Sequence, residues 1–322
     1  MNFLTTRLAA FFMMACVGAS HAQDWPNRPV RIISPFTAGG GSDTIARILA
    51  TQLSEKLGKQ FIVENRGGAG GLIGTAATAK AEPDGYTLVM SSIATHVIAP
   101  ATNPNAGFDP LKSFTHIAYV GGPPTVIVAH PSLGAKNFSE LLATLRSSPQ
   151  PTAYVSPGPG TLGNLLAEFW ARKEKLKLTH ITYKGAGQAV GDLVAGHVKL
   201  GSVTLTAALA HMRAGTIIPL AVSSNSRLAE FPGVPTLKEL GYPDMVATTW
   251  FSVAGPAGVP VQIAQKLNQE IIKAIETPTV RQRFKTEEIE TERMTPDELT
   301  RFIEGEIAKW APLAKSAINP AP

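Results

Sequence analysis

The chain has 322 residues, a formal net charge of +5 at pH 7 and one cysteine, Cys16. Its basic residues are scattered and form no stripe interleaved with aromatic residues, which argues against nucleic-acid binding. A mildly positive chain of this length suits a small anionic ligand and is long enough for two lobes.

The first 22 residues have the pattern of a secretory signal peptide. Arg7 precedes the apolar stretch LAAFFMMACV, which is too short to span a bilayer, and the small-x-small sequence SHA at 20–22 follows. Acylation of Cys16 is a weaker alternative, because the preceding MMA is a poor lipobox. Residues 23–322 then contain no cysteine, which excludes disulfides, thiolate catalysis and cysteine-ligated metals in the mature chain. We therefore expect a periplasmic protein, cleaved near Ala22.

Short apolar runs alternate with helical patterns, which predicts a mostly parallel α/β fold. The first helix is expected from about Asp43 to Leu57, with Ser42 or Asp43 as its N-cap and Gly58 at its end. Later helices are expected at about 139–146, 260–276 and 296–315. The predicted strands lie in VRIISPF, FIVEN, YTLVMSS, FTHIAYVG, TVIVAHP, TAYVS, LTHITYKG, KLGSVTLTAAL and TIIPLAVSS.

Glycine-rich turns follow several of these strands and open helices. In open α/β sheets such turns gather at the carboxyl edge, where ligands bind, and their N–H groups suit an anion. GPGTLG (158–163) matches the dinucleotide fingerprint, but the next strand ends in Lys184 where an acidic residue is needed. GGGSDT (39–44) lacks the lysine of a P-loop. We expect anion capture between two walls of turns and no cofactor; a purely structural turn at 158–163 is the alternative.

Catalytic and metal-binding patterns are weak. His96 follows a strand and is either a ligand contact or a structural hydrogen-bonding group. The other histidines are spread over separate elements without ligand spacing, so we expect no metal. There is no G-x-S-x-G motif, and no base is expected beside Ser42 or Ser156, so the ligand should be held unchanged. The competing hypotheses are an α/β hydrolase that uses one of these serines and a sensor that signals to a membrane partner.

Several blocks resemble one known family over essentially all of residues 23–322. The chain is similar to the substrate-binding proteins of tripartite tricarboxylate transporters, also called the Bug family. The blocks that carry the resemblance, in the family's order, are WPNRPVRIISPFTAGGGSD, VENRGGAGGLIGTAATAKAEPDGYTLVMSS, ITYKGAGQAVGDLVAGHV, FPGVPTLKELGYP, FSVAGPAGVP, TPDEL and EIAKW.

The resemblance implies a two-lobed periplasmic binding protein of the Venus-flytrap type, type II. Lobe 1 would comprise residues 23–125 and 250–322, and lobe 2 residues 126–249. Such a protein is not an enzyme: it captures a small mono- or dicarboxylate, aliphatic or aromatic, and delivers it to membrane permease subunits. We expect a monomer without cofactor or nucleic-acid partner.

The resemblance also implies two ligand-binding walls. The wall of lobe 1 would contain Phe36, Thr37, Ala38, Gly39, Gly40, Ser42, Asp43, Ala69, Gly70, Thr95 and His96. The wall of lobe 2 would contain Ser156, Gly160, Thr161, Asn164, Lys184, Gly185, Ala186 and Thr204. For Asp43, our own interpretation of the pattern favours a helix cap, with ligand contact as the alternative. Lys184 could reach a second carboxylate, and Phe36 or Trp250 could face an aromatic ring; the alternative for each is a structural role.

Two positions depart from the family's usual pattern. Asn164 stands where the family usually has histidine, and SVTLTA (202–207) lacks the usual aspartate. The ligand class is therefore less well defined by the resemblance than the fold is.

Overall fold

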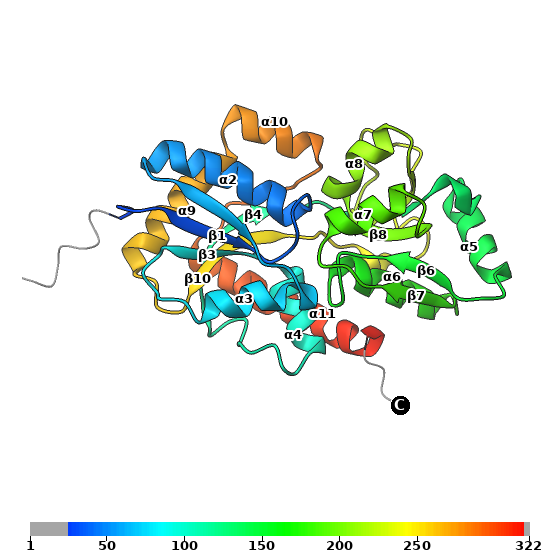
Figure 1. Ribbon diagram of the computed structural model, residues 1–322, viewed down its shortest axis with the longest axis horizontal. Coiled ribbons are helices and arrows are strands. Elements are labelled where there is room, and N and C mark those ends of the chain that lie inside the picture. Colours follow the sequence, from blue (N-terminus) through cyan, green and yellow to red (C-terminus); the bar gives the residue numbers. More distant parts are fainter. Residues whose placement is uncertain (1–24, 319–322) are drawn as a thin grey trace, which may run out of the picture.

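Two five-stranded sheets lie side by side in the computed structural model, which describes residues 25–318 (Figure 1). The predicted signal peptide, residues 1–22, lies outside the described residues. Each sheet is covered by helices, so the molecule has two α/β lobes, as predicted.

The first sheet has the strand order β2-β1-β3-β10-β4. Its strands are β1 (Val30–Ser34), β2 (Phe61–Asn65), β3 (Thr87–Ser92), β4 (Phe114–Gly121) and β10 (Phe251–Pro256). The helices of this lobe are α2 (Gly41–Leu57), α3 (Leu72–Ala79), α4 (Ala99–Thr102), α9 (Val261–Ile275) and α10 (Pro278–Thr286), with a 3-10 turn at Ala69–Gly71 and a π-helical turn at Ala94–Ile98.

The second sheet repeats this plan with the order β7-β6-β8-β5-β9. Its strands are β5 (Thr125–Ala129), β6 (Thr152–Val155), β7 (Leu178–Ile181), β8 (Leu200–Thr204) and β9 (Ile218–Val222). The helices of this lobe are α5 (Phe138–Ser147), α6 (Leu162–Lys173), α7 (Ala186–Val194) and α8 (Leu205–Arg213), with 3-10 turns at Pro131–Leu133 and Pro243–Met245.

One strand in each sheet runs against the other four, so the predicted mostly parallel arrangement is confirmed with one reversal per sheet. β10 is antiparallel to both β3 and β4, and β5 is antiparallel to both β8 and β9. Each reversed strand is the first one after the chain has crossed from the other sheet. The two crossings run together, since the Thr249 amide donates to the Pro123 carbonyl at 2.8 Å.

Helix α2 carries the first glycine-rich turn into the cleft between the lobes. Its buried face includes Ile45, Leu49 and Leu53, at the spacing expected for an amphipathic helix. The expected cap was wrong: the helix begins at Gly41, and its N-cap, Gly40, makes no side-chain hydrogen bond. Gly58 ends the helix in the left-handed conformation, with φ of 68°, as predicted.

The C-terminal helix α11 (Pro296–Ile318) extends from the first lobe toward the second (Figure 1). It packs on β4 in the first lobe and on α6 in the second. One apolar cluster contains Tyr119 of β4, Trp170 of α6 and Trp310 of α11, so the two lobes share part of their core. The prediction had placed this segment in lobe 1 alone.

The prediction missed helix α10. Its sequence, PTVRQRFKT, is mostly polar and offers only two buried side chains, Val280 and Phe284. The sequence feature that could have predicted this helix is the Thr277-Pro278 pair at its start. The Thr277 hydroxyl accepts a hydrogen bond from the Val280 amide, and proline is favoured in the first turn of a helix.

Candidate ligand-binding cleft

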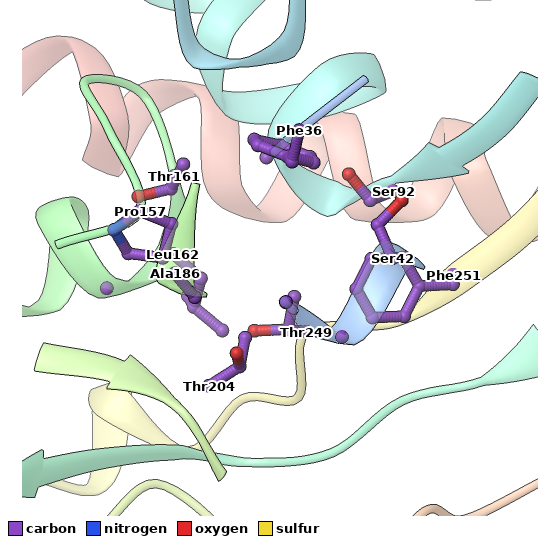
Figure 2. Close-up of a pocket in the computed structure, with 14 residues that line it drawn as sticks. Phe36, Ser42, Ser92, Pro157, Thr161, Leu162, Ala186, Thr204, Thr249 and Phe251 are labelled. Carbon is purple, nitrogen blue, oxygen red and sulfur yellow. The ribbon is translucent and has the colours of Figure 1, made fainter. Parts of the chain in front are cut away.

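A cavity lies between the two lobes, among residues at or just beyond strand ends of both sheets (Figure 2). The space between the lining residues is about 400 Å³ when the part open to solvent is included. Its lining is Phe36, Gly40, Gly41, Ser42, Ser92, Ala94, Pro157, Thr161, Leu162, Gly163, Ala186, Thr204, Thr249 and Phe251. Because both lobes supply the lining, a ligand there would be enclosed only while the lobes are together.

The lobe-1 wall is shaped by the turn between β1 and α2. Gly39 has a φ of 82°, a left-handed conformation that favours glycine. The next residue, Gly40, is the N-cap of α2. At Gly41 an added Cβ would lie 2.8 Å from the Thr206 hydroxyl of lobe 2 and 3.2 Å from the Phe251 ring. The turn can therefore approach the opposite lobe only because it has no side chain at that position.

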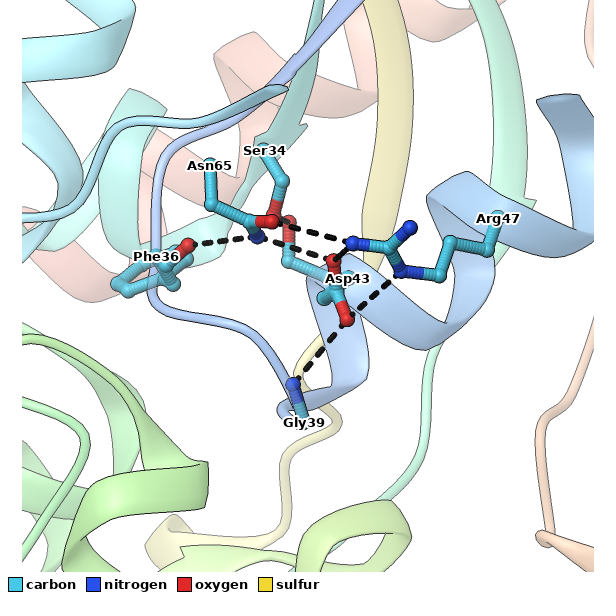
Figure 3. A network of polar contacts seen from close by, with 7 residues as sticks. Ser34, Phe36, Gly39, Asp43, Arg47 and Asn65 are labelled. Carbon is cyan, nitrogen blue, oxygen red and sulfur yellow. Dashed lines mark hydrogen bonds and ion pairs between the residues drawn. The ribbon is translucent and has the colours of Figure 1, made fainter. Parts of the chain in front are cut away.

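A buried carboxylate holds this turn in place (Figure 3). Asp43 accepts hydrogen bonds from the Gly39 amide at 3.1 Å and from the Asn65 side-chain amide at 2.9 Å, and it pairs with Arg47 at 2.9 Å. Burial raises the pKa of Asp43, but the hydrogen bonds from Arg47, Asn65 and Gly39 together hold it below its ordinary value of 3.8. The carboxylate is thus ionised and fully occupied by partners within lobe 1.

The lobe-2 wall is built from the start of α6. Thr161 is the N-cap of this helix, and its hydroxyl donates to the Gly158 carbonyl at 2.7 Å. Asn164 fixes the same turn, because its side chain accepts from the Gly160 amide at 3.1 Å and donates to the Tyr154 hydroxyl at 2.8 Å. These contacts hold the start of α6 at the cavity, where Thr161, Leu162 and Gly163 form part of the lining.

Four helix N-termini meet at the cavity. Lining residues come from the starts of α2, α6, α7 and α8, and each of these helices has at least nine residues. The first N–H groups of a helix lack intrahelical partners, and the helix dipole makes that end partly positive. Every lining residue is uncharged. The cavity therefore favours a small anion through backbone groups rather than through a lysine or arginine.

Thr204 supplies a side-chain donor to this arrangement. It is the N-cap of α8, yet its side chain makes no capping hydrogen bond. It is 7% exposed, and its hydroxyl has no partner in the structure. A buried hydroxyl without a partner is unfavourable unless a ligand or water satisfies it. Thr204 is thus positioned to donate to a bound anion.

The two walls touch along a narrow seam beside the cavity. The Thr37 amide donates to the Lys184 carbonyl across the seam at 3.0 Å. An added Cβ at Gly185 would lie 2.3 Å from the Thr37 hydroxyl oxygen, and one at Gly70 would lie 2.1 Å from the Pro159 carbonyl oxygen. Glycines at these points allow the backbones of the two lobes to meet.

Six of the predicted site residues line the cavity: Phe36, Gly40, Ser42, Thr161, Ala186 and Thr204. The other predicted residues do not line the cavity; these are Thr37, Ala38, Gly39, Asp43, Ala69, Gly70, Thr95, His96, Ser156, Gly160, Asn164, Lys184 and Gly185.

His96 lies in the core of the first lobe, with no exposed surface. Its Nδ1 atom is 3.0 Å from the Thr95 hydroxyl, and its ring packs against Phe114 and His116. Burial, together with the nearby His116, holds the pKa of His96 well below its ordinary value. It is therefore neutral at pH 7 and offers no positive charge to an anion.

Ser156 has a base beside it, contrary to our expectation. His180 Nε2 lies 2.8 Å from the Ser156 hydroxyl, and burial lowers the pKa of His180 to about 4. However, Ser156 is fully buried and does not line the cavity, and its hydroxyl also contacts the Gly158 carbonyl and amide, both at 3.2 Å. The pair supports the turn before α6 rather than facing the ligand space.

Four further lining residues, Gly41, Pro157, Leu162 and Gly163, lie within the stretches 36–42 and 156–164 that were expected to form the walls, although they were not singled out. The sequence analysis missed four: Ser92, Ala94, Thr249 and Phe251. Five of the lining residues that were not singled out are direct sequence neighbours of residues that were: Gly41, Ala94, Pro157, Leu162 and Gly163. Thr249 comes from the returning crossing and Phe251 from the start of β10. The aromatic neighbour that we had considered there, Trp250, instead donates to Glu306 of α11 at 2.8 Å.

Within residues 25–318 no group of three or more His, Cys, Asp or Glu side chains could hold a metal ion. In the same part of the chain, no helix has the length and apolar character needed to cross a bilayer.

Comparison with known proteins agrees with this architecture. The family described as "Tripartite tricarboxylate transporter family receptor" matches residues 45–318. The chain belongs to this family. Among curated relatives, BugT of Bordetella pertussis is 36% identical over 97% of this chain and 96% of its own length. The predicted resemblance to the Bug family is therefore confirmed.

Solved structures of family relatives share the two-lobed fold. Rpa4515 of R. palustris, solved with adipate, is 31% identical, with a TM-score of 0.87 over 91% of this chain and 98% of its own. MatC of Rhodopseudomonas palustris, solved with bound malate, is 28% identical, with a TM-score of 0.85 over 90% of this chain and 100% of its own. The periplasmic binding protein BugD is 31% identical, with a TM-score of 0.87 over 91% of this chain and 98% of its own.

Proposed function

We propose that this protein is a periplasmic solute-binding protein that encloses a small carboxylate between its lobes and delivers it to membrane permease subunits of a tripartite transporter. Export would use residues 1–22 as a signal peptide. Residues 23–125 with 250–322 would move as one lobe and residues 126–249 as the other, around the paired crossings. The relatives solved with adipate and malate support a carboxylate ligand.

The observation that carries this proposal is the convergence of four helix N-termini on an uncharged cavity that contains the unpartnered hydroxyl of Thr204. A carboxylate accepts several hydrogen bonds at once, so it can satisfy amides from both walls and this hydroxyl together. A cation would meet the positive ends of the helices and is disfavoured.

Capture would couple to lobe closure through the seam. When the lobes separate, the lining divides and the hydrogen bond from the Thr37 amide to the Lys184 carbonyl is lost. A carboxylate that bridges the two walls binds the closed form better than the open form and therefore shifts the population toward closure. A permease that recognises the closed surface would then select loaded protein, and reopening would release the ligand chemically unchanged.

Thr204→Val tests the site directly. The variant keeps the shape of the side chain and removes its hydroxyl, so we expect the affinity for the bound carboxylate to fall about tenfold or more, since a hydrogen bond to a charged group contributes about 1.5–3 kcal/mol. The measurement is calorimetric titration of residues 23–322, after partial unfolding and refolding to remove any carried ligand, with a panel of carboxylates and their amides.

Ser91→Ala is the control, because the Ser91 hydroxyl is also buried and unpartnered but does not line the cavity. Its affinity should stay near that of the parent protein. If no carboxylate bound the parent protein, or if the amides bound as well as the acids, the proposal would be overturned. Recovery of the bound acid with an altered mass would instead support an enzyme.

A further inference from the structure

A groove that shares no residue with the ligand cavity lies beside the two crossings between the lobes. Its space is about 680 Å³ when the part open to solvent is included. The lining comes from residues 223–225 of lobe 2, from the returning crossing at 246–248 and Trp250, and from β4 and α11 of lobe 1. Glu290 also lines it, and the Glu290 carbonyl accepts from the Gly122 amide of the outgoing crossing at 3.3 Å. We call this the crossing groove.

Four aromatic side chains border the crossing groove: Tyr119, Trp250, Phe302 and Trp310. The Phe302 ring packs edge-on against Tyr119 and Trp250, with ring centroids 5.3 and 5.4 Å away. Aromatic rings attract cations, and tryptophan attracts them most strongly. The chain already places one cation in this way, since Lys309 Nζ lies 4.7 Å from the centroid of the Trp310 ring.

Two carboxylates stand beside these rings without a basic partner. Glu306 Oε2 accepts from the Trp250 indole at 2.8 Å, and Glu290 is exposed. Neither carboxylate forms an ion pair within residues 25–318. In a chain with a net charge of +5, this lining has two carboxylates and one ammonium group, that of Lys309. The crossing groove therefore favours an added cation.

Tyr119 supplies a buried polar group to the same groove. It is 9% exposed, and in the described part of the chain its hydroxyl has no hydrogen-bond partner. Burial, followed by the carboxylates of Glu306, Glu292 and Glu290, raises the pKa of Tyr119, so its hydroxyl stays protonated close to these groups. A protonated hydroxyl keeps its lone pairs and can accept a hydrogen bond from an N–H group.

We propose that the crossing groove binds an arginine side chain of a partner protein. A guanidinium group is planar, so it can lie against an aromatic ring while it donates to the Glu306 carboxylate and to the Tyr119 hydroxyl. A lysine ammonium is more strongly hydrated and lacks this fixed geometry. Buried aromatic side chains with the exposed, charged Glu290 and Lys309 at the rim are typical of a protein–protein contact. This proposal does not depend on carboxylate capture.

An NMR titration of ¹⁵N-labelled protein with a capped GGRGG peptide tests this proposal. The indole N–H signals of Trp250 and Trp310 report on the groove, and those of Trp25 and Trp170, which do not line it, are internal controls. We expect the first two signals to shift along a saturating curve at millimolar peptide. Replacing the arginine with lysine should weaken binding about threefold or more, and replacing it with neutral citrulline about tenfold or more.

Three variants locate the contact. Glu306→Gln should weaken the arginine peptide about tenfold, because it removes the charge while its amide oxygen can still accept from the Trp250 indole. Glu304→Gln is the matched control, since Glu304 is exposed on the same helix and does not line the groove. Lys309→Ala should strengthen binding about twofold or more, because it removes a like charge from the Trp310 ring.

Several results would overturn the proposal. These are equal binding of the arginine and citrulline peptides, equal effects of Glu306→Gln and Glu304→Gln, or no shift of the Trp250 and Trp310 signals at tens of millimolar peptide. Lysine binding as tight as arginine binding would overturn the assignment to a guanidinium group. Carboxylate capture is measured at the other cavity, so its success or failure is independent of these results.

Discussion

Asp43 is a case in which one side chain supports the binding wall without lining it. Its carboxylate connects the first turn of α2 to Asn65 after β2 and to Gly39 in the glycine-rich turn. We expect Asp43→Ala to lower the free energy of unfolding by about 2 kcal/mol, because it removes charged hydrogen bonds from a buried position. Urea unfolding at pH 7 measures this change.

The pH dependence of stability gives a second test at Asp43. Its folded pKa is below the ordinary value of 3.8, so its contribution is complete above that value and is lost as the pH falls through the lower folded pKa. Asp43→Asn should therefore lose less stability than the parent between pH 5 and about pH 3. Parallel stability curves for the two proteins would contradict the network described here.

At the scale of elements, the β1–α2 turn and the start of α7 decide whether the cleft can close. Gly185 has a φ of 163°, an extended conformation that any residue can adopt, yet its Cα faces Thr37 across the seam. Gly185→Ala should fold normally but obstruct closure. We expect its carboxylate affinity to fall more than tenfold, because the binding-competent closed form becomes rare. Calorimetry and small-angle scattering with saturating ligand would measure the loss of affinity and of compaction.

Gly191→Ala provides the control in the same helix. An added Cβ at Gly191 meets nothing within 4 Å, so this variant should close normally and gain about 0.5–1 kcal/mol of stability from the better helix former. Equal affinities for both variants would mean that the seam does not control binding.

Helix α11 contacts both lobes, and one apolar cluster contains side chains from both of them. Because Trp310 of α11 packs in the same cluster as Trp170 of lobe 2 and Tyr119 of lobe 1, we expect both lobes to unfold in one cooperative transition. Trp310→Ala should lower the free energy of unfolding by about 3–5 kcal/mol, whereas the exposed Lys315→Ala should have little effect. Urea unfolding followed by tryptophan fluorescence and by circular dichroism tests this; separate transitions would show that the lobes are independent.

Local signals were sufficient for much of the fold. The alternation of strands and helices, the glycine turns after strands and the left-handed stop at Gly58 depend on short-range periodicity and on backbone conformations that favour glycine. The same turns led to six of the lining residues, because the carboxyl edge of a sheet is set by chain direction alone. Helix α10 was missed since its polar sequence has little periodicity.

By itself, the sequence determined most of the order of the elements, though not β10 or α10, together with the two-lobed class and the family. Only the tertiary structure decided which side chains face the ligand space. Asp43 turns toward Asn65, His180 reaches Ser156 from a neighbouring strand, and Phe251 rather than Trp250 borders the cavity. These outcomes depend on contacts between residues that are far apart in the chain. Packing and burial determine such contacts, and local sequence periodicity carries no information about them.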